Sequence, residues 1–136
     1  MSIVNEVLAA VIGLMNDTHP FATVTRGALP TGVGIVCEVG PSGPGTVFLA
    51  KDSYVDLDVT LNGKHHNLQT LSDAMNGIHE ALTQARVYPT DTAAFRWQIV
   101  DIVTNTLPQI IGREDNNEWL MASSLSVRFY TEGEVA

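Results

Sequence analysis

Charged side chains are scarce in this chain, and basic ones are the scarcest. Charged residues make up 16% of the 136 residues, below the roughly one quarter that is typical of globular domains. Fifteen acidic residues oppose seven Lys and Arg, which gives a formal net charge of −8. Because proteins hold nucleic-acid phosphates and anionic membrane surfaces chiefly through Lys and Arg, this balance argues against binding to either.

Cysteine and long apolar segments are lacking as well. Cys37 is the one cysteine, so no intramolecular disulfide is possible and a reducing compartment is expected. No apolar run approaches the roughly 18 residues of a membrane span, and the N-terminus lacks the basic start of a secretory signal. Hydrophobic residues still make up 45%, the normal share for a globular core. The composition therefore predicts a soluble intracellular protein with a single domain over residues 1–136.

Helical periodicity marks two segments. Apolar residues at helical spacing predict a helix over 3–15. A second helix is predicted over 67–85, with Asn67 as its N-cap. Gly77 interrupts this helix at a cost of about 1 kcal/mol relative to Ala, so we expect it to mark close packing. The apolar residues of the second helix recur every three or four positions: Leu68, Leu71, Met75, Ile78, Leu82 and Ala85.

Between and after these helices the pattern is that of strands. Short strand-like runs cover 22–29 and 33–39. The segment 53–62 alternates most cleanly, which predicts a strand with one buried and one solvated face. Asn62-Gly63 then predicts a tight turn. The residues expected on the buried face of this strand are Val55, Leu57, Val59 and Leu61.

Two long strands are predicted near the C-terminus. The first, 95–106, has apolar residues on both faces, so we expect it in the centre of the sheet or paired with a neighbouring subunit; Leu107-Pro108 ends it. A polar loop at 112–118 precedes a last strand at about 118–130 and an acidic, flexible tail at 131–136. Segregated strands and two helices predict an α+β domain, with a mainly antiparallel sheet packed against two helices.

Histidines and carboxylates do not assemble into a metal motif. His65 and His66 are adjacent, so in an extended segment their side chains point in opposite directions and make a poor chelate. Counted as a calcium loop from Asp58, the third position is Thr60 and the twelfth is Gln69, where Asp or Asn and then Glu are needed. A solvated strand face explains these residues better than a metal site does.

The sequence pattern does not indicate a catalytic nucleophile or an acid–base pair either. Glu38 lies beside Cys37 and raises its thiol pKa, which favours a buried structural thiol over a nucleophile. Glu38 and Asp101 lie in otherwise apolar strands, and hydrogen bonding at an edge or subunit contact is favoured over a buried acid–base pair. Gly32-Val33-Gly34 lacks the third glycine of a dinucleotide fingerprint. The sequence predicts a protein that is not an enzyme and holds no cofactor or metal.

Two other interpretations stay open at this point. Trp97, Trp119 and Tyr54 are candidate stacking platforms for a small ligand or a carbohydrate, which would make the protein a binding module. An enzyme whose site is assembled from scattered Asp and His residues is the other. Neither is required by any motif in the chain.

The order of elements resembles a known family. The run Tyr54 to Gln69 ends a strand in Asn-Gly-Lys and enters a helix, and the run Thr106-Leu-Pro-Gln-Ile-Ile-Gly112 leads through a polar turn to a Trp-led strand, 119–130. Over about residues 1–131 this resembles the small minor capsid and tail-terminator proteins of long-tailed bacteriophages.

The resemblance implies a virion protein at the tail or the head–tail junction, assembled in the host cytoplasm. Such a subunit forms a homo-oligomeric ring, commonly a hexamer, that caps the tail tube and joins it to the head. Its implied partners are further copies of itself, the tail tube protein and head–tail connector proteins, and DNA passes through the ring without specific binding. Another component of the head–tail connector is the alternative within this group.

Polar positions on the predicted strands 53–62 and 95–106 and in the loop 112–118 are the candidates for a subunit interface or a ring lumen. Carboxylates are expected to outnumber bases on the lumen wall, because a negative wall disfavours contacts with phosphate. The candidate positions are Asp56, Asp58, Arg96, Gln98, Arg113, Glu114, Asp115 and Glu118.

Overall fold

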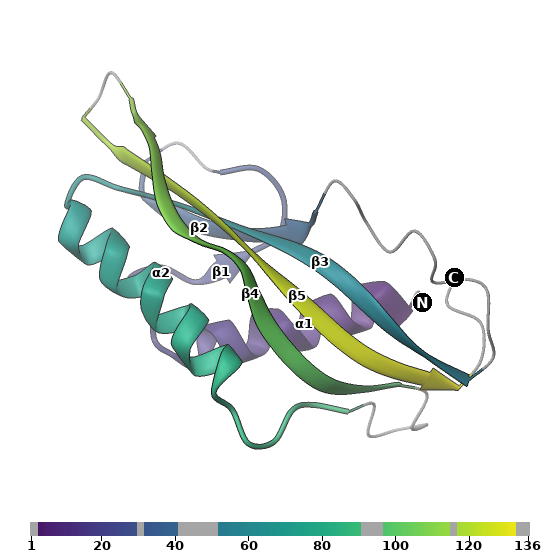
Figure 1. Cartoon of the computed structure of the whole chain (residues 1–136). Coiled ribbons are helices and arrows are strands. Elements are labelled where there is room, and N and C mark those ends of the chain that lie inside the picture. The colour runs from purple at the N-terminus through teal and green to yellow at the C-terminus, as the bar shows by residue number, and fades with distance from the viewer. Residues whose placement is uncertain (1–2, 30–31, 41–51, 91–96, 115–116, 133–136) are drawn as a thin grey trace.

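Two helices lie on one face of a five-stranded sheet in the computed structural model (Figure 1). The structure describes residues 3–29, 32–40, 52–90, 97–114 and 117–132. Strand order is β1-β2-β3-β5-β4, and every pairing is antiparallel except that of β1 with β2. The predicted α+β architecture is therefore confirmed. The elements are α1 (Ile3–Asn16), β1 (Val24–Thr25), β2 (Gly34–Val39), β3 (Asp52–His65), α2 (Leu68–Thr83), β4 (Trp97–Arg113) and β5 (Trp119–Glu132).

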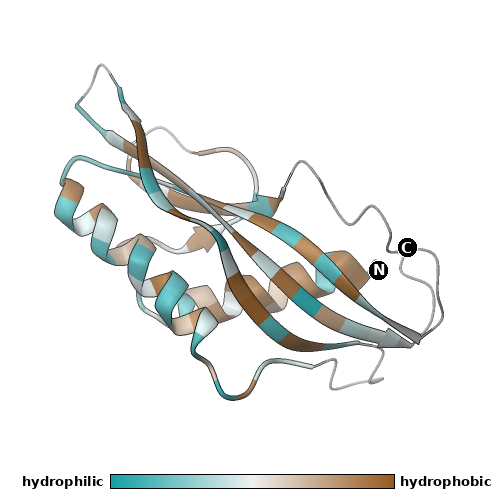
Figure 2. Ribbon diagram, in the orientation of Figure 1, coloured by the Kyte–Doolittle hydropathy of each residue, from teal (hydrophilic) through white to brown (hydrophobic). Residues whose placement is uncertain are grey.

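The centre of the sheet is the long antiparallel pair β3–β5. Its register runs without a break from Asp52 opposite Glu132 to His65 opposite Trp119. Alternate residues face the helices, so apolar and polar residues alternate along both strands in Figure 2. The buried residues of the two strands include Val55, Leu57, Val59, Leu61, Met121, Leu125, Val127 and Phe129, which confirms the predicted faces.

Helix α2 packs on this apolar face. It begins after Asn67, whose side-chain oxygen accepts a hydrogen bond from the Thr70 amide at 3.1 Å, as predicted for the N-cap. Leu71, Met75, Ile78 and Leu82 are all buried in the same core cluster as the apolar residues of β3. Because the helix's apolar face meets the sheet's apolar face, both lose contact with water together.

Gly63 in β3 and Gly77 in α2 do not have the structural roles that the sequence predicts for them. Asn62-Gly63 does not form the predicted turn, because β3 continues through it to His65. A Cβ at Gly63 would lie 2.8 Å from Leu71 Cδ1 and 3.0 Å from Met75 Sδ, so this glycine lets α2 approach the strand. The expectation for Gly77 is also wrong, since a Cβ there would meet nothing within 4 Å.

Strand β4 lies at the edge of the sheet, so the central one of its two predicted placements is wrong, and pairing with a neighbouring subunit stays a prediction. It also continues through Leu107-Pro108 to Arg113, because an edge strand tolerates a residue without an amide hydrogen. A register shift between Ile99 and Asp101 changes the phase of the strand. Ile102 therefore enters the core, and Val103 is exposed.

Several predicted boundaries also shift. Only Val24–Thr25 of the run 22–29 forms a strand, and the polar connection between β4 and β5 is shorter than 112–118 because Gly112 and Arg113 belong to β4. Thr131 is buried within β5, so the tail does not begin at 131. Residues 133–136 and the first two residues of the predicted strand 95–106 lie outside the described part of the chain.

Candidate functional site

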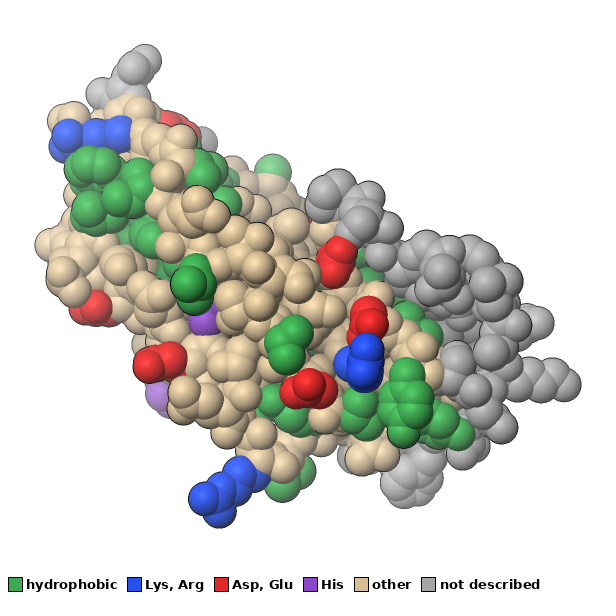
Figure 3. Space-filling view, viewed as in Figure 1, with side chains coloured by type: hydrophobic (Ala, Val, Ile, Leu, Met, Phe, Trp, Pro, Cys, Tyr) green, Lys and Arg blue, Asp and Glu red, His purple; other side chains and the backbone are tan. Residues whose placement is uncertain are grey.

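A row of charged side chains crosses the face of the sheet that points away from the helices, called here the free face. Arg128 on β5 donates to both carboxylate oxygens of Asp56 on β3, at 2.8 and 3.0 Å. Asp101 on β4 lies opposite Arg128 on its other side. Hydrogen bonding to Arg128 lowers the pKa of Asp56, and the same contact raises the pKa of Arg128. Figure 3 shows basic and acidic side chains close together on this face of the molecule.

The free face is acidic beyond this row. Asp58 on β3 accepts a hydrogen bond from the Asn105 side chain of β4 at 3.1 Å. Asp56, Asp101, Asn105 and Arg128 line a shallow hollow of about 320 Å³. Three carboxylates and one guanidinium therefore meet on this part of the free face, which gives it a negative charge.

Aromatic side chains lie at one end of the free face. Tyr54 and Tyr130 are cross-strand neighbours with ring centroids 5.4 Å apart, and Gln98 lies opposite Tyr130 on β4. Tyr54 is exposed. Trp97, by contrast, is buried, and its indole nitrogen donates to Glu6 at 3.5 Å. Trp97 therefore cannot serve as the stacking platform that the ligand-binding interpretation requires.

A second charged cluster lies where the β4–β5 hairpin turns. The ammonium of Lys64, itself buried, lies 3.4 Å from Glu114 Oε1 and 3.9 Å from Glu118 Oε1. His66 Nε2 lies 3.6 Å from the other oxygen of Glu118. Glu118 is fully buried, so its carboxylate faces Lys64 and His66 rather than solvent. This cluster fixes the hairpin against the end of β3.

Trp119, the third candidate stacking platform, lies at the same end. The guanidinium of Arg113 lies 4.6 Å from the centroid of the Trp119 ring, which is cation–π distance. Arg113 thus covers one face of the indole that a ligand would need for stacking. The ligand-binding interpretation is left with Tyr54 and the uncovered part of Trp119.

Exposed apolar side chains follow the edge strand. Val103, Leu107, Ile110 and Ile111 of β4 are 47%, 67%, 50% and 61% exposed, respectively. We call these four residues the β4 apolar stripe. Large apolar residues exposed singly are common, whereas contiguous exposed apolar patches are typical of interaction surfaces.

His79 is the buried titratable group beneath this edge. Its Nε2 lies 2.7 Å from Ser123 Oγ and its Nδ1 lies 2.9 Å from Thr104 Oγ1. The Ser123 hydroxyl also lies 3.4 Å from the Leu61 carbonyl, to which it can donate. Burial lowers the pKa of His79. The tautomer of His79 sets which group donates in its contacts with Ser123 and Thr104.

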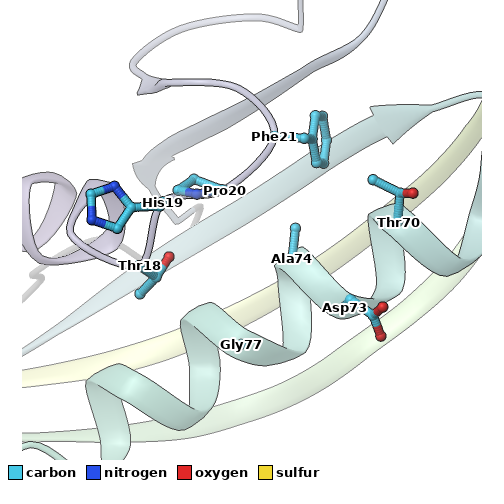
Figure 4. A pocket seen from close by; sticks show the side chains of 8 residues that line it. All are labelled: Thr18, His19, Pro20, Phe21, Thr70, Asp73, Ala74 and Gly77. Carbon is cyan, nitrogen blue, oxygen red and sulfur yellow. The ribbon is translucent and has the colours of Figure 1, made fainter.

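A hollow of about 250 Å³ lies between α2 and the segment that connects α1 to β1 (Figure 4). Its polar side chains do not converge. In Figure 4 the His19 ring and the Asp73 carboxylate lie on different walls and point away from each other. Gly77 forms part of the floor, where open space explains why a Cβ would meet nothing. The arrangement lacks the convergent polar groups of a binding site for a small molecule.

The other residues that were considered as metal-binding or catalytic candidates make local structural contacts. His65 Nδ1 accepts from the Asn67 amide at 2.8 Å, so this nitrogen serves the start of α2. Glu38 forms an ion pair with Arg26 at 2.6 Å, and that hydrogen bond lowers the pKa of Glu38. Cys37 is buried, as predicted, and burial raises its pKa to about 12. Within the described residues, no three His, Cys, Asp or Glu side chains are placed to hold a metal ion.

The structure divides the predicted interface or lumen positions into two groups. Asp56, Asp58 and Gln98 share the free face, whereas Arg113, Glu114 and Glu118 lie at the hairpin end. Arg96 and Asp115 lie outside the described residues. Sequence reasoning did not place Arg128 or Asn105 beside the carboxylates of β3. Only the strand register brings these groups together, because they are far apart along the chain.

Neither α1 nor α2 is long and apolar enough to cross a membrane.

No protein-family model matches the chain, and neither does any curated protein. Eight chains of solved structures match it. One is a chain of the "Virion of native gene transfer agent (GTA) particle", with a TM-score of 0.64 and 15% sequence identity. The alignment covers 94% of this chain and 98% of that chain, so the likeness of fold extends over nearly the whole of both.

Proposed function

We propose that this protein is a structural component of a phage-like virion. The observation that carries the proposal is the likeness of fold to a chain of a gene transfer agent virion, which spans nearly the full length of both chains. The surface agrees with a protein that binds other proteins. Polar groups on the free face are paired with one another, and the β4 apolar stripe is exposed along the edge of the sheet.

More specifically, we propose a tail terminator, a ring of several copies that caps the tail tube and joins it to the head connector. The order of elements supports this role through its resemblance to the terminators of long-tailed phages. In this assignment the partners are further copies of the chain, the tail tube protein and the connector proteins. A hexamer, the common form of such rings, is the expected stoichiometry.

The charge distribution supports a passive conduit for DNA. Six copies would carry a formal charge of 6 × −8 = −48, and the free face presents Asp56, Asp58 and Asp101 beside Arg128. A free face turned toward the lumen would repel phosphate, so DNA would slide without being held. We therefore assign the free face to the lumen wall.

Immunogold electron microscopy of particles purified from the producing strain tests the proposal. An antibody against this chain is expected to label the junction of head and tail. Deletion of the gene should give tail tubes of unregulated length, because an uncapped tube continues to add subunits. Normal tube length together with label at the junction would favour another connector component. Label along the whole tube, or no label on any particle, would contradict the proposed function.

A further inference from the structure

The β4 apolar stripe lies within an uncharged segment. From Ile102 to Gly112 the strand contains no Asp, Glu, Lys or Arg. Figure 3 shows hydrophobic side chains following β4 from the hairpin end toward the middle of the sheet. Beside Leu107 lies a hollow of about 410 Å³, lined also by Asn76, His79, Glu80, Thr83 and Thr104. The stripe therefore offers apolar side chains next to a space that accepts others.

The backbone of this edge is unsuited to pairing with a further strand. Pro108 has no amide hydrogen to donate, and the register against β5 shifts three times between Thr104 and Gly112. Such irregularities are a common means of blocking strand addition. A partner must therefore contact the stripe through side chains, as the outer face of a helix does.

Charge narrows the choice of partner surface when the partner is a second copy. Copies that each carry −8 repel one another, so their contact is favoured where neither surface is charged. The outer face of α2 carries Asp73 and Glu80, both exposed, and the free face carries its carboxylates. These surfaces would place further negative charge in the contact.

Helix α1 is the surface that fits. Between Val7 and Asn16 it contains no charged residue, although it is an outer layer of the molecule. Ala9 and Gly13 are exposed on it, Ile12 is half-buried, and a Cβ at Gly13 would meet nothing within 4 Å. The hairpin end of the stripe and the α1 face lie in different parts of the molecule in Figure 1. One copy can therefore use both surfaces at once.

We propose that the β4 apolar stripe of one copy packs against the outer face of α1 of a second copy. Because the two surfaces differ, the contact is head-to-tail, and it closes into a ring where the rotation between copies permits. Closure into a ring rests on the proposed function. The pairwise contact itself rests on the exposed side chains of the stripe and of α1, and on the absence of charged residues from 102–112 and 7–16.

Two blocked variants test the contact. Leu107→Lys/Ile111→Lys disables the stripe, and Ala9→Arg/Gly13→Arg disables the α1 face. Each pair changes the formal charge from −8 to −6, so loss of assembly cannot come from stronger repulsion between copies. Val87→Lys is the matched control, because Val87 is 83% exposed but lies outside both surfaces. Thermal unfolding of each variant should match the wild type, since all the changed side chains are exposed.

Molar mass is measured by light scattering from about 1 µM to about 1 mM, a range that covers moderate and weak complexes. The wild type and Val87→Lys are expected to show species above the monomer mass, and each blocked variant only the monomer. An equimolar mixture of the two blocked variants should give a species of twice the monomer mass and nothing larger. In that mixture, one variant supplies an intact stripe and the other an intact α1 face.

Three outcomes would overturn the contact. These are a monomeric wild type over the whole range, blocked variants that assemble like the wild type, and a mixture that stays monomeric. Assembly of α1-blocked protein alone into dimers would indicate that the stripe contacts itself, which also overturns the proposal. Blocked variants that still assemble would leave the virion role intact. A virion role that fails by microscopy would leave a successful mixing result standing.

Discussion

Replacement of Ile78 by Ala is the most direct test of the core. Ile78 on α2 is fully buried in the cluster that α2 forms with β3. The change removes three carbon atoms, and at about 0.8 kcal/mol for each the lost transfer free energy is about 2.4 kcal/mol. A residual cavity of about 50 Å³ adds roughly 1 kcal/mol at about 24 cal/mol per Å³. We expect Ile78→Ala to lower the free energy of unfolding by about 3–4 kcal/mol.

Urea unfolding followed by circular dichroism measures this loss, at a protein concentration low enough that self-association does not add stability. Gly77→Ala is the matched control on the same helix. Its new Cβ meets nothing within 4 Å, so the better helix propensity should raise stability by up to about 1 kcal/mol. A loss below about 1 kcal/mol for Ile78→Ala, with an unchanged slope against urea, would refute the placement of α2 on the sheet.

Four further predictions concern other parts of the molecule. Gly63→Ala should cost about 1–3 kcal/mol in the same urea assay, because its Cβ would lie 2.8 Å from Leu71 Cδ1 and 3.0 Å from Met75 Sδ, so these buried side chains must shift; unchanged stability would contradict the close approach. Cys37, buried and with its pKa raised to about 12, should react with a thiol reagent far more slowly in the folded protein than in urea, and equal rates would show that the thiol is accessible. Burial lowers the pKa of His79 in the folded state. Below about pH 6.5 the unfolded chain therefore binds more protons than the folded protein, and the free energy of unfolding decreases as the pH is lowered. Urea midpoints across this range should vary less in His79→Gln than in the wild type. With seven bases against fifteen acids, the protein should not shift duplex DNA in a gel at physiological salt, and tight binding at low salt would overturn the passive conduit.

Local pattern was enough to predict most of the fold. The alternation of β3 and the three- and four-residue spacing of α2 each predict a buried face that the structure confirms. These signals are strong because burial of one face imposes a period on the sequence itself. Asn67 was identifiable for a similar reason, since an N-cap acts on an amide only three residues away.

Errors occurred where a distant element decides the outcome. Asn62-Gly63 has the composition of a turn, but the close approach of Leu71 accounts for the glycine. A proline ends a strand that is paired on both sides, but β4 is an edge strand and continues through Pro108. The order of strands in a sheet cannot be predicted from the local sequence. The bulge after Ile99 likewise decides which of the following residues face the core, and the sequence pattern does not show it.

The surfaces were harder to predict than the core for the same reason. The carboxylate of Asp56 was identifiable as exposed on a strand face, but its pairing with Arg128 depends on the register of β3 against β5. Glu118 was expected in a polar loop, and the fold instead buries it beside Lys64. Neither contact leaves a periodic signal, because each joins residues from separate parts of the chain.

The central position of β3 and β5 has a consequence for how the chain folds during synthesis. β3 ends at His65, but its main partner is complete only at Glu132, near the C-terminus. At about 5–20 residues per second, a ribosome takes roughly 3 to 13 s to make the intervening chain. During that interval β3 can pair only with β2 and pack against α2, so its other edge stays unpaired on the nascent chain. A chaperone that shields extended segments should therefore raise the soluble yield of this protein, and a truncation before β5 should aggregate.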